Sequence, residues 1–222
     1  MCIAILRKPT GTITDEAIQN SARANSDGGG YAYWDPEAKK VVVKKGFSTV
    51  SKFLEAFRAD EQKYGNHPML LHFRIATMGK VCEDNCHPFL FEHGAAIHNG
   101  TFFNGGYLAE KSDTRLFIED AGKYIIPAKL ADPEKVRKLG EVIGSYNKMA
   151  FLFNDGSYAI INESGGYWDN DVWYSNSSYR CSFYSRGGRH YSSDFSRCGY
   201  PRSWTYDEDG GAEAYVRGRV MD

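Results

Sequence analysis

Aliphatic side chains become scarce after residue 163 of this 222-residue chain, which limits where a hydrophobic core can form. From Glu163 to Tyr206, Val172 is the only Leu, Ile or Val, while twelve aromatic residues and five Arg occur there. A stretch of this composition cannot build an aliphatic core of its own. We therefore predict one domain over 2–174, ending in a short strand at 172–174, and an extension over 175–222 that is either disordered or partner-binding.

Hydrophobic periodicity predicts an α+β fold for that domain. Thr14 precedes a helix-like segment with acidic residues in its first turn, as an N-cap does. Asn154-Asp-Gly156 between two apolar runs predicts a hairpin. The expected helices span 14–24, 51–64, 114–124 and 133–145, and the expected strands span 2–6, 31–34, 41–45, 69–77, 94–98, 149–153 and 157–162.

Charge and apolar run length exclude several classes of protein. The chain carries 27 Lys and Arg against 28 Asp and Glu, whereas dedicated nucleic-acid binders are usually basic. Its longest apolar run, residues 1–6, is far below the roughly 20 residues of a membrane span and has no basic start typical of a secretory signal. The five cysteines make an odd count, so we expect a cytoplasmic protein with reduced thiols.

Cys2 is the most informative single residue. Removal of Met1 by methionine aminopeptidase, which accepts a small second residue, would give Cys2 a free α-amine beside its thiol. An α-amine has a reference pKa of about 7.7–8.0, so it can serve as a base near neutral pH. Such a residue combines nucleophile and base. The alternative is a small buried cysteine in a first strand.

Further motifs follow Cys2 in a fixed order. They are H-F-R-I-A-T-M-G at 72–79, N-C-H-P-F at 85–89, H-N-G at 98–100, and D-T at 113–114. An initial Cys with these motifs in this order resembles the class II glutamine amidotransferases, which belong to the N-terminal-nucleophile (Ntn) hydrolases. The resemblance covers about residues 2–162 and includes the glycine turn at 25–30. Three positions, Phe73, Ile75 and Met78, depart from the common pattern.

The resemblance implies a four-layer αββα sandwich of two antiparallel sheets, with Cys2 at the end of a central strand. It also implies a glutaminase, a hydrolase or transferase in which Cys2 attacks the side-chain amide of glutamine and forms a thioester intermediate. The side chain of Asn99 and the backbone N–H of Gly100 would stabilise the oxyanion. Taken alone, Asn-Gly is equally typical of a hairpin turn.

The glutamine pocket implied by the resemblance needs one cation and one anion. Arg74 would bind the α-carboxylate, Asp113 would bind the α-ammonium, and Thr77 would line the pocket. As alternatives, Arg74 could form a strand-edge ion pair, and Asp113 could be a helix N-cap or fill both roles. The three motif histidines are expected to be structural, since the resemblance assigns the role of base to the Cys2 amine.

Neither a metal nor a cofactor is expected. Cys82, Cys86 and His87 cluster, but the two cysteines lack the usual zinc spacing and no second pair follows. Gly28-Gly-Gly30 precedes an expected strand rather than a helix, which speaks against a nucleotide site. With no acceptor domain in the sequence, the ammonia would pass to a separate enzyme chain.

Two other functions remain open at this point. One is a related Ntn amidohydrolase that acts on another amide, and the other is a catalytically silent binding protein that uses its aromatic tail. The tail composition suits a protein partner, a solvated loop or, less well, single-stranded nucleic acid. We expect glutamine as substrate, no membrane contact and no nucleic-acid partner.

Overall fold

The computed structural model describes residues 2–47, 49–77, 79–102 and 110–180, together with the backbone of two short strands further on. Those strands, β11 (Trp204–Tyr206) and β12 (Ala212–Ala214), pair with each other. The expected extension over 175–222 therefore lies mostly outside the described residues, as do Met1 and Met78.

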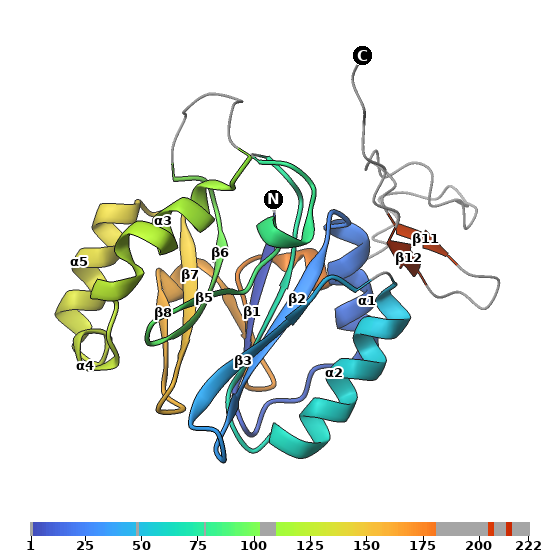
Figure 1. The fold of residues 1–222 in the computed structure, drawn as a ribbon, viewed down its shortest axis with the longest axis horizontal. Coiled ribbons are helices and arrows are strands. Elements are labelled where there is room, and N and C mark those ends of the chain that lie inside the picture. Colours follow the sequence, from blue (N-terminus) through green and yellow to red (C-terminus); the bar gives the residue numbers. More distant parts are fainter. Residues whose placement is uncertain are drawn as a thin grey trace, which may run out of the picture.

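Two antiparallel sheets and their covering helices make an α+β domain, as predicted (Figure 1). The larger sheet has the strand order β3-β2-β4-β1-β10-β9 and the smaller one β5-β6-β7-β8. The strands of the larger sheet are β3 (Lys40–Lys45), β2 (Gly29–Asp35), β4 (Met69–Phe73), β1 (Ile3–Arg7), β10 (Val172–Tyr174) and β9 (Tyr167–Asp169). The smaller sheet contains β5 (Phe89–Phe91), β6 (Gly94–Asn99), β7 (Lys148–Phe153) and β8 (Tyr158–Ile161).

Helices cover the outer face of each sheet (Figure 1). The larger sheet is covered by α1 (Asp15–Ala24) and α2 (Val50–Tyr64), and the smaller one by α3 (Asp113–Ala121), α4 (Pro127–Leu130) and α5 (Pro133–Ile143). Short 3₁₀ turns occupy Glu83–Asn85, Gly122–Tyr124, Glu163–Gly165 and Ser177–Tyr179. Each of the four longer helices begins at a side-chain cap, and Thr14 is one of them, as predicted.

Strand β1 is buried on both faces, and its side chains alternate between two cores. Ile3 and Ile5 pack toward α1 and α2, whereas Ala4 and Leu6 pack between the two sheets. Successive side chains of a strand point to opposite faces, so a strand covered on both sides is apolar throughout. The unbroken apolar run at the start of the chain is therefore the signature of a central strand.

The structure corrects several predicted boundaries. The strand expected over 69–77 ends at Phe73, and the helix expected over 133–145 ends at Ile143, where Gly144 adopts a φ of 84°. Strands β5 and β9 and helix α4 were not predicted, because segments of three or four residues carry too little periodicity. The strand expected at 172–174 is confirmed as β10.

Residues 175–180 belong to the folded body, although the composition assigned them to the extension. The Tyr179 ring is buried and stacks on Tyr174 with 3.6 Å between ring centroids. Asn20 in α1 donates a hydrogen bond to the Tyr179 carbonyl at 3.2 Å. Aromatic stacking and hydrogen bonds hold this segment where aliphatic side chains are missing, so the domain reaches at least Tyr179.

Phe53 in α2 should carry much of the stability of the helix-covered core. Its buried ring lies within 6.1 Å of four other aromatic rings, those of Tyr31, Phe47, Phe57 and Phe73, measured between centroids. Phe53→Ala should lower the free energy of unfolding by about 3–5 kcal/mol, because it leaves a cavity among these rings. Urea denaturation measures the change. Glu55→Ala, on the exposed face of the same helix, should change it by less than about 0.5 kcal/mol.

Candidate active site

Cys2 lies immediately before β1 and is held by contacts from two other segments. Its Sγ–H donates to the carbonyl of Ile75 at 3.3 Å, and the Ile75 N–H donates to Sγ at 3.4 Å. On the other side, Asn176 Nδ2 donates to the Cys2 carbonyl at 2.7 Å. The thiol is therefore fixed against the bend that follows β4.

Burial raises the pKa of the Cys2 thiol above its usual value, while the Ile75 hydrogen bond and the charge of Arg74 oppose this effect. The net rise keeps the sulfur protonated near neutral pH. A thiol must lose its proton to act as a nucleophile, so the site needs a base close to the sulfur.

The bend that touches Cys2 is held by the glycine turn at 25–30. Arg74 N–H donates to the Gly28 carbonyl at 2.7 Å, and the Arg74 carbonyl accepts from Asp27 N–H at 2.8 Å. Asp27 Oδ2 also accepts from the Ala76 N–H at 2.8 Å. Gly28 has a φ of 129°, and a Cβ on it would lie 2.4 Å from Cys86 Sγ. Only glycine fits this position, which explains the turn composition.

Asn99 ends β6 and is tied to the strand that follows Cys2. Its buried side-chain Nδ2 lies 2.9 Å from Ser175 Oγ, which also accepts from the Ala4 N–H at 2.9 Å. The Asn99 Oδ1 atom is buried and has no partner among the described residues. The Ser175 hydroxyl therefore connects Asn99 at the end of β6 to Ala4 in β1, and Ala4 is two residues after Cys2.

Gly100 leaves β6 without starting a hairpin. Strand β6 pairs with β5, which precedes it, and with β7, which begins only at Lys148, so the hairpin alternative for Asn-Gly is wrong. Gly100 has a φ of 155°, and a Cβ there would lie 2.1 Å from Asn147 Oδ1. The missing side chain thus allows the backbone to pass close to Asn147.

Asp113 occupies the first turn of α3 but is not its N-cap. Ser112 holds that position and accepts from the Arg115 N–H at 3.3 Å. The Asp113 carboxylate accepts at 2.8 Å from the N–H groups of Thr114 and Phe102. It therefore anchors the segment that follows Gly100 to the start of the helix, and the N-cap alternative is wrong.

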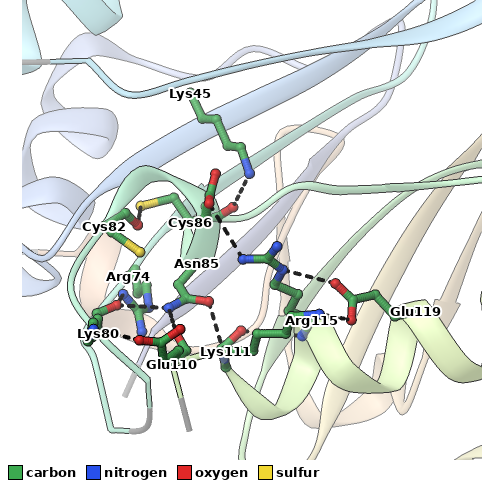
Figure 2. A network of polar contacts seen from close by, with 12 residues as sticks. Lys45, Arg74, Lys80, Cys82, Asn85, Cys86, Glu110, Lys111, Arg115 and Glu119 are labelled. Carbon is green, nitrogen blue, oxygen red and sulfur yellow. Dashed lines mark hydrogen bonds and ion pairs between the residues drawn. The ribbon is translucent and has the colours of Figure 1, made fainter.

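Asn85 links the Arg74 and Asp113 parts of the site, a role the sequence did not reveal (Figure 2). Its Nδ2 donates to the carbonyls of Lys80 at 3.0 Å and Glu110 at 2.6 Å, and its Oδ1 accepts from the Ser112 N–H at 2.9 Å. Arg74 Nη1 donates to the same Lys80 carbonyl at 3.1 Å. The buried amide thus connects the segment beside Arg74 to the residue before Asp113.

Two of the three motif histidines, His72 and His98, form structural hydrogen bonds, whereas both ring nitrogens of the buried His87 have no partner among the described residues. Nε2 of His72 donates to the His98 carbonyl at 2.9 Å, and His98 bonds to Thr114 Oγ1 at 2.8 Å and Asn147 Oδ1 at 3.0 Å. Burial lowers the pKa of His72 to about 3 and that of His98 to about 4, and it holds the pKa of His87 well below its usual value. All three are neutral at pH 7, and no hydrogen bond in the described part of the chain joins them to the Cys2 sulfur.

The expected pocket role of Thr77 finds little support in the geometry. Thr77 is exposed, and no hydrogen bond in the described structure joins it to the other candidate residues. Within the described ranges, no three His, Cys, Asp or Glu side chains gather as a metal site would require. Cys86 is buried, its Sγ–H donates to the Cys82 carbonyl at 3.4 Å, and burial raises its thiol pKa to about 11.

A surface hollow of about 650 Å³ lies away from all of these residues, between α5 and the segment before β9. Its lining includes Arg137, Asn162 and Trp168 but none of the candidate residues, so the hollow is separate from the candidate site.

Comparison with protein-family models finds no match, and comparison with curated proteins finds none either. None of the helices described here is both long and apolar enough to cross a bilayer.

Acid should destabilise the fold through the buried neutral histidines. An unfolded histidine takes up a proton below about pH 6.5, whereas His98 stays neutral until about pH 4. The unfolded state therefore binds more protons between about pH 6.5 and pH 4. As the pH is lowered through this window, the free energy of unfolding falls by about 1 kcal/mol per pH unit for each such residue. Urea midpoints between pH 4.5 and 7 should show a shallower slope for His98→Gln than for the wild type. An unchanged slope would contradict the assignment.

Proposed function

We propose that the chain hydrolyses the side-chain amide of glutamine and that Cys2 is the nucleophile. The observation that carries the proposal is the convergence of motif residues on the start of β1. The Cys2 thiol is hydrogen-bonded to the backbone of Ile75, the neighbour of Arg74. The side chain of Asn99 is joined to Ala4 in β1 by hydrogen bonds through Ser175 Oγ. Two separate motifs thus make contact with the first residues of the chain, one at the Cys2 sulfur and one at Ala4 through Ser175.

The reaction would run in two stages. After removal of Met1, the Cys2 α-amine takes the thiol proton, and the thiolate attacks the amide carbon of glutamine. The C–N bond then breaks, the protonated amine supplies the proton that lets ammonia leave, and a thioester to Cys2 remains. Water, deprotonated by the same amine, attacks the thioester and releases glutamate. The raised thiol pKa makes such a base necessary.

The oxyanion in both stages would be stabilised by Asn99 and Gly100. The side chain of Asn99 is buried, and the close packing of Gly100 against Asn147 would hold the backbone from which the Gly100 N–H donates. Hydrogen-bond donors in a desolvated site act strongly on a developing negative charge. Loss of one donor typically costs about 2.7–4 kcal/mol of transition-state stabilisation.

The two ends of glutamine would be recognised by Arg74 and Asp113. Arg74 is buried, and its fork of donors suits a carboxylate. Asp113 already accepts two backbone hydrogen bonds, but a carboxylate offers about four lone-pair positions, so it can also accept from an ammonium group. Asn85 would keep these two parts of the pocket in register.

On this proposal the chain is a glutaminase of the class II amidotransferase type, with the αββα arrangement of an Ntn hydrolase. The two antiparallel sheets and their outer helices are compatible with that arrangement. The ammonia would be consumed by a separate enzyme chain.

One observation favours a second candidate, an Ntn amidohydrolase for an amide without a free α-ammonium. Both oxygens of Asp113 accept backbone N–H groups, and Thr77 is exposed. The two candidates differ in their preference between glutamine and N-acetylglutamine. A glutaminase should strongly prefer free glutamine, since the acetylated substrate would leave Asp113 without its cation.

Replacement of Cys2 tests the nucleophile. Cys2→Ala should abolish ammonia release from glutamine, because it removes the sulfur that would attack the amide, whereas Cys82→Ala should retain it. A glutamine-like chloroketone should add a single adduct to Cys2, which intact mass spectrometry detects together with the loss of Met1. Ammonia release that survives in Cys2→Ala, with the adduct on Cys82, would contradict the proposal.

Replacement of Arg74 tests substrate recognition. Arg74→Lys keeps the positive charge but loses the two-point contact with a carboxylate, so the KM for glutamine should rise about tenfold or more. The kcat should change less, because the α-carboxylate is bound equally in the ground state and the transition state. Arg115→Lys, on α3, is the matched control and should keep the wild-type KM. If Arg74→Lys had the same KM for glutamine as Arg115→Lys, the assignment of Arg74 to the glutamine pocket would be wrong.

A further inference from the structure

We infer that Ser175 is a positioning residue that fixes the direction of the Asn99 side-chain amide, so that its NH₂ group faces the reacting carbonyl. The inference rests on the proposed function for the role of Asn99. It assigns Ser175 to the catalytic machinery, although no motif contains this residue.

The contacts of Ser175 single it out among the residues around Asn99. The residue is 1% exposed and follows β10 directly. Its N–H donates to the Ala4 carbonyl at 2.9 Å, while its Oγ accepts from the Ala4 N–H at 2.9 Å and lies 2.9 Å from Asn99 Nδ2. Ser175 thus satisfies both backbone groups of Ala4 and still has a hydroxyl hydrogen to donate.

The amide of Asn99 can take two directions that differ by half a turn about its last side-chain bond. With Nδ2 toward Ser175, the hydroxyl oxygen accepts twice, its hydrogen has no acceptor in the described structure, and Asn99 Oδ1 has no partner. With Oδ1 toward Ser175, the hydroxyl donates to Oδ1 while its oxygen still accepts from Ala4. The second direction pairs both the hydroxyl hydrogen and the amide oxygen.

The second direction also leaves the right group for catalysis. Both N–H bonds of Asn99 would then point to the side where Oδ1 now lies without a partner. An oxyanion formed there would accept from them, whereas an amide oxygen in the same place would repel it. Unpaired buried donors are costly in the resting enzyme, and the developing negative charge removes that cost only in the transition state.

The link to Ala4 gives Ser175 a second use. The hydroxyl that orients Asn99 also accepts a hydrogen bond from Ala4 in β1, and Cys2, the proposed nucleophile, directly precedes β1. The donor and the thiol are therefore held by one short chain of atoms from β6 through Ser175 to β1, which fixes their spacing.

Kinetics of Ser175→Ala test this role against a merely structural one. The kcat for glutamine should fall at least tenfold, up to the 10²–10³-fold typical for loss of a whole donor, with the KM within about threefold of the wild type. Ser175→Thr keeps the hydroxyl and should restore most of the kcat. In an Asn99→Ala background, Ser175→Ala should cost much less kcat than in the wild type, because only its contact with Ala4 is then left to lose. Rates are expressed per folded protein, as determined by urea denaturation.

The direction of the amide can be measured without any substrate. Neutron diffraction distinguishes nitrogen from oxygen, so a neutron map of the full chain shows which amide atom faces Ser175 Oγ. Oδ1 facing Oγ supports the inference, and Nδ2 facing Oγ overturns it, whether or not Ser175→Ala folds. A full additional loss of kcat in the Asn99→Ala background would also overturn it. If the wild type releases no ammonia from glutamine, the proposed function fails, while the neutron map still decides the direction of the amide.

Discussion

The burial of β1 on both faces is the constraint on which the rest of the structure depends. A strand between two other strands, under helices on one side and against a second sheet on the other, must be almost entirely apolar, and the one charged residue of β1, Arg7 at its end, is paired with Glu61. Its polar backbone groups are then satisfied only by neighbours fixed in register. Ser175 meets both groups of Ala4, and Asn176 holds the carbonyl of Cys2. Cys2, which precedes this strand, is thus held by the fixed strand and by its own contacts with Asn176 and Ile75, and such a fixed position is what a nucleophile would require.

Much of the fold could be predicted from the sequence, because its signals are local. Thr14 caps α1, and the repeat of Phe53 and Phe57 marks the buried face of α2. The double burial of β1 is visible in its unbroken apolar run. The limits of the domain could not be predicted in this way, since Tyr179 is held by stacking on Tyr174 and by Asn20 of α1. Composition detects aliphatic cores, and it does not detect a segment anchored by one aromatic pair and hydrogen bonds from distant residues.

The candidate site likewise has one part that local sequence signals predict and another that depends on contacts between distant residues. Residues that would touch the substrate lie in recognisable motifs, and Cys2, Arg74, Asn99 and Asp113 could be named from the sequence. Asn85 belongs to one of these motifs and Ser175 to none, but the holding role of neither could be predicted, because they act through partners 27 and 76 positions away. A short polar side chain has no signature of its own, and its role depends on which backbone groups the fold leaves without partners. Only the three-dimensional structure shows where those groups are.

Apart from Arg74 and Asp113, whose charged side chains bond to backbone groups, the polar side chains of the candidate site are amides, hydroxyls and neutral imidazoles. Desolvation raises the pKa of the Cys2 thiol and lowers that of His72, so an added charge would be costly in this environment. Neutral donors avoid that cost in the resting state and still act on a charge that forms during a reaction. Because neutral groups attract weakly over distance, they must be aimed accurately, and each must be held by a further hydrogen bond. Residues such as Asn85 and Ser175 are therefore expected around a candidate site buried between two sheets. Burial strengthens each hydrogen bond there, and a misaligned polar group has no water molecule to bond to instead.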